Sequence, residues 1–201
     1  GVRLACEELN IDLAGGDTTA SVTGLTVNVT AIGRARRNDI VYRNGAKPND
    51  LICITGNLGA AYMGLQLLER EKRRDVITAL AEEKLRPTAM IDLSDGLASD
   101  LMQLCKASDC GARIYLERIP IARQTHQLAE EMHTDPVVAA LNGGQDHELL
   151  FTVPLSMQEQ VMRLGLVDVI GHITQPGTGC YLVTPDGSDI RLKAQGFKEG
   201  I

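Results

Sequence analysis

Three short segments of the chain combine glycine with carboxylate side chains. They are Gly-Gly-Asp-Thr-Thr at residues 15–19, Ile-Asp-Leu-Ser-Asp-Gly at 91–96 and Gly-Gly-Gln-Asp-His-Glu at 143–148. Glycine lets a backbone turn sharply and approach a ligand closely, and aspartate oxygens are ligands that magnesium on a phosphate prefers. The three segments together therefore predict chemistry on a metal-bound nucleotide.

The second segment lies where phosphate groups are often bound in proteins. Asp92 is expected at the carboxyl end of a strand, and Ser94 and Asp95 at the start of the next helix. Unpaired backbone amides and the helix dipole favour an anion there. The alternative is that Ser94 or Asp95 only caps the helix, which explains one carboxylate well and two poorly.

The first segment supports two interpretations. Asp17 could accept a hydrogen bond from its own backbone in an ordinary loop. It could also hold magnesium while Gly16 admits a phosphate, so that Asp17, Asp92 and Asp95 form one cluster from segments about 75 residues apart.

Further residues give weaker signals. Gly56-Asn57-Leu58-Gly59 has the geometry of a phosphate-binding turn without a known nucleotide-binding pattern, and Arg43 could bind a phosphate or be an ordinary exposed arginine. In the third segment, glycines could turn Gln145 and Asp146 toward a cleft. No serine or cysteine nucleophile motif accompanies His147, so triad chemistry is not expected.

Composition narrows the class of protein. The 201 residues are 44% hydrophobic, carry a formal net charge of −6 and have a pI near 5.2, which disfavours binding to nucleic acid or anionic lipid. No apolar run reaches the roughly 18 residues of a membrane helix, and a cytoplasmic enzyme is expected. The five cysteines include no Cys-x-x-Cys pair, so they are expected to be reduced thiols.

Hydrophobic periodicity predicts an α/β (α+β) fold, because strands and helices interleave along the chain. Strands are expected at residues 25–31, 51–54, 89–93, 112–116, 148–153, 168–173, 180–184 and 190–192. Helices are expected at residues 2–9, from 58 onward, and at 76–85, 94–106, 122–132 and 156–164. Turn signals at residues 44–50 place a boundary between a first domain, 1–45, and a second, 46–201.

The three segments, together with residues 43–48 and 54–59, resemble the motifs of the thiamine-monophosphate kinase family in their order along the chain. Single motifs also occur in the wider ATP-dependent superfamily of aminoimidazole-ribonucleotide synthetase. The resemblance implies the two-domain fold of that superfamily, with the end of the amino-terminal ATP- and metal-binding domain followed by the carboxyl-terminal α/β domain. It also implies a cytoplasmic homodimer that transfers a phosphoryl group from ATP to thiamine monophosphate.

The same resemblance implies a role for individual residues. Asp17, Asp92 and Asp95 would hold magnesium, with Asp17 and Asp92 serving catalysis. Gly16, Asp17, Arg43 and Ser94 would contact ATP, and Gln145 and Phe197 the acceptor substrate.

The chain departs from the family pattern in three respects: we expect an amino-terminal portion with its own Gly-Asp-Asp metal motif to be missing, the stretch between residues 68 and 86 is short, and the third motif differs. The third motif of the family usually reads Gly-Gly-Glu-Asp-Tyr-Glu, whereas this chain has Gln145 and His147. The sequence also opens within a helical pattern and without methionine, so we expect a fragment that is inactive by itself. Another ATP-dependent synthetase of the superfamily and a nucleotide-binding module without catalysis remain the alternatives.

Overall fold

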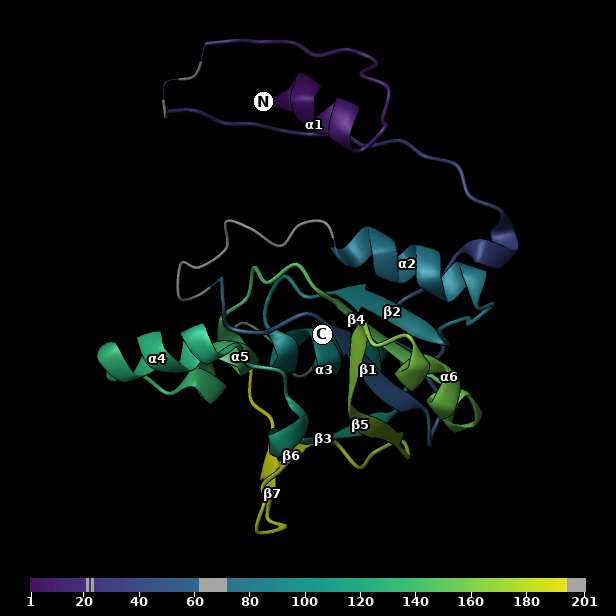
Figure 1. Ribbon diagram of the computed structural model, residues 1–201, viewed down its shortest axis with the longest axis vertical. Coiled ribbons are helices and arrows are strands. Elements are labelled where there is room, and N and C mark those ends of the chain that lie inside the picture. Colours follow the sequence, from purple (N-terminus) through teal and green to yellow (C-terminus); the bar gives the residue numbers. More distant parts are fainter. Residues whose placement is uncertain (21, 23, 62–71, 195–201) are drawn as a thin grey trace. The chain divides into compact units, whose positions relative to one another are not determined.

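The computed structural model describes residues 1–20, 22, 24–61 and 72–194 (Figure 1). The chain divides into two compact units, Gly1–Arg37 and Asn38–Ile201, and each is described by itself. The boundary predicted between residues 45 and 46 remains a prediction. No helix within the described ranges is long and apolar enough to cross a membrane.

The first unit begins with helix α1 (Val2–Glu8), which confirms the predicted helix. The described residues between this helix and the 3-10 helix η1 (Arg37–Asp39) form no further helix or strand. The strand predicted at residues 25–31 is wrong, because these residues form no strand. The side chains of Leu25 and Val29 are 95% and 74% exposed. Alternating apolar residues form a stable strand only where a neighbour supplies hydrogen bonds and a core, and the described residues of this unit supply neither.

The second unit is built on one mixed seven-stranded sheet, in the order β2-β4-β1-β5-β3-β6-β7. Neighbouring strands are antiparallel except β3 and β6, which are parallel. The strands are β1 (Leu51–Thr55), β2 (Ala89–Asp92), β3 (Gly111–Tyr115), β4 (Leu149–Val153), β5 (Val167–Thr174), β6 (Cys180–Val183) and β7 (Asp189–Arg191). Each corresponds to a strand predicted from the sequence, within one or two residues.

In the described part of the second unit, five helices and two short 3-10 helices accompany the sheet. They are α2 (Lys72–Glu82), α3 (Leu97–Ser108), η2 (Leu116–Arg118), α4 (Arg123–Glu131), α5 (Pro136–Asn142), η3 (Leu155–Met157) and α6 (Gln158–Arg163). Helix α5 was not predicted, although Asp135 and Pro136 are a typical start: the Asp135 carboxylate accepts a hydrogen bond from the Val137 amide at 2.8 Å. The helix predicted after Gly59 lies mainly at residues 62–71, outside the described residues.

The alternation of side chains along the strands creates a hydrophobic core on each face of the sheet. On one face, Ile52 and Ile54 of β1 pack in a cluster that includes Leu97, Leu101 and Leu104 of α3. On the other face, Leu51 and Cys53 join a second cluster, with Val76 and Leu80 of α2 and Val161 of α6. The interleaved α/β layering expected from the sequence is thereby confirmed.

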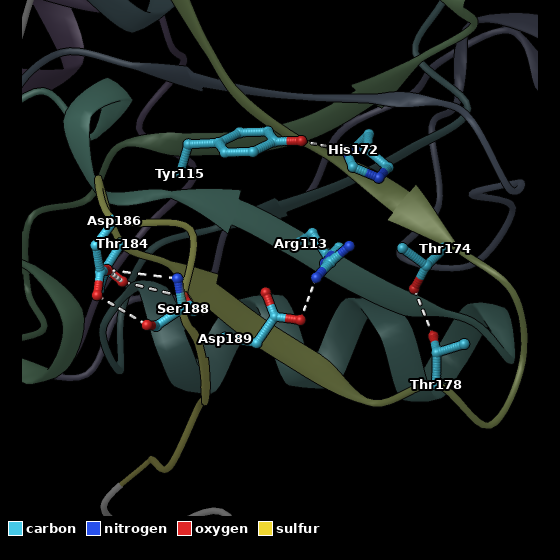
Figure 2. A network of polar contacts seen from close by, with 9 residues as sticks. All are labelled: Arg113, Tyr115, His172, Thr174, Thr178, Thr184, Asp186, Ser188 and Asp189. Atoms are coloured by element: carbon cyan, nitrogen blue, oxygen red, sulfur yellow. Dashed lines mark hydrogen bonds and ion pairs between the residues drawn. The ribbon is translucent and has the colours of Figure 1, made fainter.

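Polar side chains occupy strands β3, β5 and β7 (Figure 2). Arg113 pairs with Asp189, and the hydroxyl of Tyr115 lies 3.3 Å from Nδ1 of His172. Burial lowers the pKa of His172, and the nearby Arg113 charge lowers it further. The contact between Tyr115 and His172 links β3 and β5, close to the point where His172 pairs with Arg113 in the sheet.

We expect Gly171→Ala to destabilise the second unit strongly. A Cβ on Gly171 would lie 2.1 Å from the carbonyl oxygen of Arg113, and the backbones of β3 and β5 can separate only by breaking the sheet. The loss should be about 2–3 kcal/mol, as for an overpacked core. Urea unfolding gives the free energy of unfolding of each variant.

Gly165→Ala serves as the control, because a Cβ there meets no atom within 4 Å. Its φ of 63° is left-handed, so alanine should cost only about 1 kcal/mol. An equal loss in the two variants would contradict the close approach of β3 and β5.

Candidate functional site

Three loops meet at one edge of the sheet because β1 and β2 both run antiparallel to β4, which lies between them. Ile54 pairs with Leu150, and Asp92 pairs with Leu149. The carboxyl ends of β1 and β2 therefore lie beside the start of β4. This register brings together the loop 56–61, the turn 93–96 and the segment 143–148, although they are far apart in the sequence.

The turn after β2 presents the predicted residues of the second segment. Asp92 and Asp95 are exposed, and the Ser94 hydroxyl donates a hydrogen bond to the Asp92 carboxylate. Helix α3 was predicted to begin at Ser94 but begins at Leu97. The reason is that the amides of Ser94 and Asp95 both donate to the carboxylate of Asp100, at 3.0 Å each, in a turn that precedes the helix.

The buried carboxylate of Asp100 stabilises this turn. Only 2% of the surface of Asp100 is exposed. Burial raises the pKa of Asp100, while the amides of Asp95 and Ser94 stabilise its charged form and oppose that rise. Sequence reasoning missed this residue. An aspartate in the first turn of a helix, five residues after Asp95, was the available signal.

Backbone hydrogen bonds link the third segment to the turn after β2. The amide of Gln145 donates to the carbonyl oxygen of Ser94 at 2.8 Å, and the amide of His147 donates to that of Leu93 at 2.9 Å. A Cβ on Gly144 would lie 2.7 Å from the Ser94 carbonyl oxygen, so only glycine allows this approach. Gln145 and His147 adopt left-handed φ values of 60° and 52°, and both are exposed.

The two acidic residues of this segment point inward instead. Asp146 was expected toward a cleft, but that prediction is wrong, since its carboxylate is buried and accepts hydrogen bonds from the amides of Gly59 (2.9 Å) and Ala61 (3.2 Å). Burial raises the pKa of Asp146, and the two amides oppose the rise. Glu148 is also buried and accepts a hydrogen bond from the hydroxyl of Thr55.

The glycine that follows β1 lies close to the carboxylate of Glu148. A Cβ on Gly56 would lie 2.3 Å from a carboxylate oxygen of Glu148, and Gly56 also has a left-handed φ of 58°. The loop predicted as a phosphate-binding turn is thus held in place by the buried carboxylates of the third segment.

Arg43 is linked to the turn after β2 through a residue of α3. Its Nη1 donates to Oε1 of Gln103 at 3.1 Å, and Nε2 of Gln103 donates to Oδ2 of Asp95 at 3.4 Å. Gln103 was not predicted, but its position eight residues after Asp95, on the helix that follows, is consistent with the contact. The link places a cation beside the exposed carboxylates.

The second unit therefore brings together five of the predicted site residues, which are Arg43, Asp92, Ser94, Asp95 and Gln145. Two exposed carboxylates, a guanidinium, a hydroxyl and an amide at one edge are groups able to bind a phosphate directly or through a metal ion.

The other predicted residues lie outside the described part of the second unit. Gly16 and Asp17 belong to the first unit, where the Asp17 carboxylate accepts a hydrogen bond from the Thr18 amide at 2.8 Å, and Phe197 lies outside the described residues. Among the described residues, no group of three or more His, Cys, Asp or Glu side chains is arranged to hold a metal ion. The cluster of Asp17, Asp92 and Asp95 remains a prediction.

Comparison with known proteins gives the family of the chain. Residues 62–179 match the family described as AIR synthase related protein, C-terminal domain. The chain is 37% identical to thiamine-monophosphate kinase of Escherichia coli (strain K12) over 88% of its length and 57% of the relative's length. It is 33% identical to thiamine-monophosphate kinase of Rhodopirellula baltica, over 100% of its length and 63% of the relative's length.

A solved structure described as AaThiL complexed with AMPPCP and TMP is also similar. It shares 26% identity with this chain at a TM-score of 0.58, over 75% of this chain and 52% of that structure. The chain thus spans between half and two thirds of the proteins it matches. It belongs to the AIR synthase related family, of which it carries the C-terminal domain.

We expect Asp100→Ala to loosen the turn after β2. The amides of Ser94 and Asp95 would lose a charged acceptor, so the free energy of unfolding should fall by about 1.5–3 kcal/mol. Hydrogen exchange of these two amides, measured by NMR, should become faster.

Asp100→Asn is the matched control for this experiment. Its side-chain oxygen can still accept from the amides, so the loss should be smaller than in the alanine variant. Unchanged exchange at Ser94 and Asp95 in the alanine variant would show that Asp100 does not hold the turn.

Proposed function

We propose that the complete protein transfers the terminal phosphoryl group of ATP to the phosphate of thiamine monophosphate and so forms thiamine diphosphate. One observation carries the proposal: Arg43, Asp92, Ser94, Asp95 and Gln145 gather at one edge of the sheet on loops braced by buried carboxylates. The names of the similar proteins and the AMPPCP and TMP bound in one of them support it.

In this proposal the exposed carboxylates act through magnesium. Asp92 and Asp95 offer oxygen ligands from one turn, and Asp17 contributes a third from the first unit. Magnesium commonly keeps several waters and takes further ligands from substrate phosphates, so a small set of protein carboxylates fits it. When bound, the ion would neutralise the charge of the polyphosphate and align it for transfer.

The remaining residues bind and orient the two substrates. Ser94 and Arg43 contact ATP together with Gly16, and the guanidinium of Arg43 supplies a charge-assisted hydrogen bond to a phosphate oxygen. Gln145 and Phe197 contact thiamine monophosphate. The attacking group is a phosphate oxygen that is already ionised near neutral pH, so the site needs no strong general base.

The proposal extends to the whole protein. Residues 1–45 would be the end of an amino-terminal domain and residues 46–201 the carboxyl-terminal domain, in a cytoplasmic homodimer.

The direct test is to incubate the complete protein with magnesium, ATP and thiamine monophosphate and to look for thiamine diphosphate by chromatography. ATP consumption only with another acceptor would indicate a different synthetase of the superfamily, and ATP binding without turnover would indicate a nucleotide-binding module.

We expect Asp92→Asn in the complete protein to lower turnover by about 100-fold, since asparagine keeps the shape but removes the charge that faces the cation. Stability should change by less than about 0.5 kcal/mol, because Asp92 is exposed. Steady-state rates at limiting magnesium and a melting curve test both expectations.

Asp109→Asn removes the same charge at the opposite end of α3, where a left-handed φ of 48° suits asparagine. This control should keep near-normal turnover. Equal turnover in the Asp92 and Asp109 variants would refute the role of Asp92 at the metal.

We expect Gln145→Glu to improve binding of thiamine monophosphate. A carboxylate accepts a stronger hydrogen bond from a donor or cationic ring than an amide does, by up to about 1.5–3 kcal/mol. The Michaelis constant for thiamine monophosphate should therefore fall, by at most about 10- to 100-fold, while that for ATP should hardly change.

Gln175→Glu, at an exposed position after β5, adds the same charge elsewhere and should leave both constants unchanged. An effect of Gln145→Glu confined to ATP, or no effect on the acceptor, would mean that Gln145 does not face thiamine monophosphate.

A further inference from the structure

Three of the five cysteines meet at the carboxyl end of α3. Cys105 lies in the last turns of that helix, Cys110 directly follows the helix, and Cys180 is the first residue of β6. The three thiols line a cavity of about 120 Å³ together with two cations, Lys106 and Arg191. None of these residues takes part in the proposed function.

The backbone fixes the positions of the three thiols. The amide of Cys110 donates to the carbonyl oxygen of Cys105 at 3.0 Å across the left-handed Asp109, a helix ending that brings the side chains at its two ends together. Cys180 pairs with Ala112 in the register of β3 and β6, and its carbonyl oxygen accepts from the Leu192 amide at 2.9 Å. The thiols therefore lie on rigid elements and face one cavity.

The three thiols differ in exposure and in their charged neighbours. Cys105 is 2% exposed, whereas Cys110 and Cys180 are half-buried, and the thiol of Cys110 donates a hydrogen bond to the carbonyl oxygen of Cys105 at 3.7 Å. The neighbouring Cys105 thiol lowers the pKa of Cys180 against the effect of burial, and the Ala112 amide and the Arg191 charge lower it further. The Cys105 thiol also lowers the pKa of Cys110, but burial and the charges of Asp109 and Asp50 oppose this shift, whereas the charged neighbour of Cys180 is the cation Arg191.

We propose that this cavity is a site of thiol–disulfide exchange with small anionic disulfides such as glutathione disulfide, in which Cys180 attacks and Cys105 resolves. Carboxylates of the reagent would pair with Lys106 and Arg191 at the cavity. The remaining cysteines are unsuited to the role: Cys53 is fully buried, which raises its pKa to about 12, and Cys6 lies in the first unit away from any other cysteine in sequence.

The exchange is balanced in two steps. The Cys180 thiolate attacks one sulfur of the disulfide, which breaks the bond between the two glutathione sulfurs and releases one glutathione thiolate that takes a proton from water. Cys105 then passes its proton to water and attacks the Sγ of Cys180. A second glutathione leaves, Cys105 and Cys180 are oxidised to a disulfide, and the reagent is reduced to two thiols.

Incubation of the chain with glutathione disulfide, followed by alkylation and peptide mapping, tests the proposal without any substitution. We expect a bond between Cys105 and Cys180, formed at least about tenfold faster than modification of Cys6. Oxidation confined to Cys6, or a bond between Cys105 and Cys110 in place of the expected one, would overturn the proposal. No enzymatic activity enters this measurement, so its failure is distinct from failure of the proposed function.

Variants identify the role of each group. Cys105→Ser should stop the reaction at a mixed disulfide on Cys180, seen as the added mass of one glutathione, and Cys180→Ser should abolish exchange in the cavity. Cys6→Ser is the matched control and should change neither result. Arg191→Gln should slow glutathione disulfide several-fold but not the cationic disulfide cystamine, and equal slowing of both would refute the preference for anionic reagents.

Discussion

The candidate site depends on buried carboxylates that accept hydrogen bonds from backbone amides. Asp100 holds the amides of Ser94 and Asp95, and Asp146 holds those of Gly59 and Ala61. Burial of a carboxylate without partners would cost several kcal/mol, and the raised pKa values of both groups record part of that cost. The amide bonds offset it, so each carboxylate fixes a loop that has no regular structure of its own.

These bonds also couple the three loops to one another. Gly144 approaches the Ser94 carbonyl, Gln145 and His147 donate to the turn after β2, and Glu148 limits the space at Gly56. A change in one loop therefore displaces groups in the other two. The sheet register sets the frame, because β4 lies between β1 and β2 and brings the three loops to the same edge.

The sequence predicted most of the second unit because its strands and helices carry clear hydrophobic periods. Strand β1 reads Leu-Ile-Cys-Ile-Thr between turn signals, and α3 repeats leucine at Leu97, Leu101 and Leu104 on one face. The predicted strand at residues 25–31 had an equally clear period but forms no strand. Hydrophobic periodicity shows that a segment could bury one face. It does not show that another strand or helix is present to cover that face.

The site was predicted less completely, since hydrogen bonds between loops leave no period in the sequence. Asp92, Ser94 and Asp95 were identified by residue type, whereas the partners that position them, Asp100 and Gln103, are ordinary polar residues of a helix. Asp146 was misplaced for a related reason: nothing in its local sequence tells whether a carboxylate after paired glycines faces solvent or the amides of a loop more than 80 residues away.

Exposed and buried side chains alternate along the third segment. Asp146 and Glu148 point inward and hold the loops, while Gln145 and His147 between them are exposed. Replacement of an inward residue would disturb the whole edge, but the outward residues can change with little effect on the fold. A shared fold can therefore accommodate changes at these two outward positions without loss of its frame.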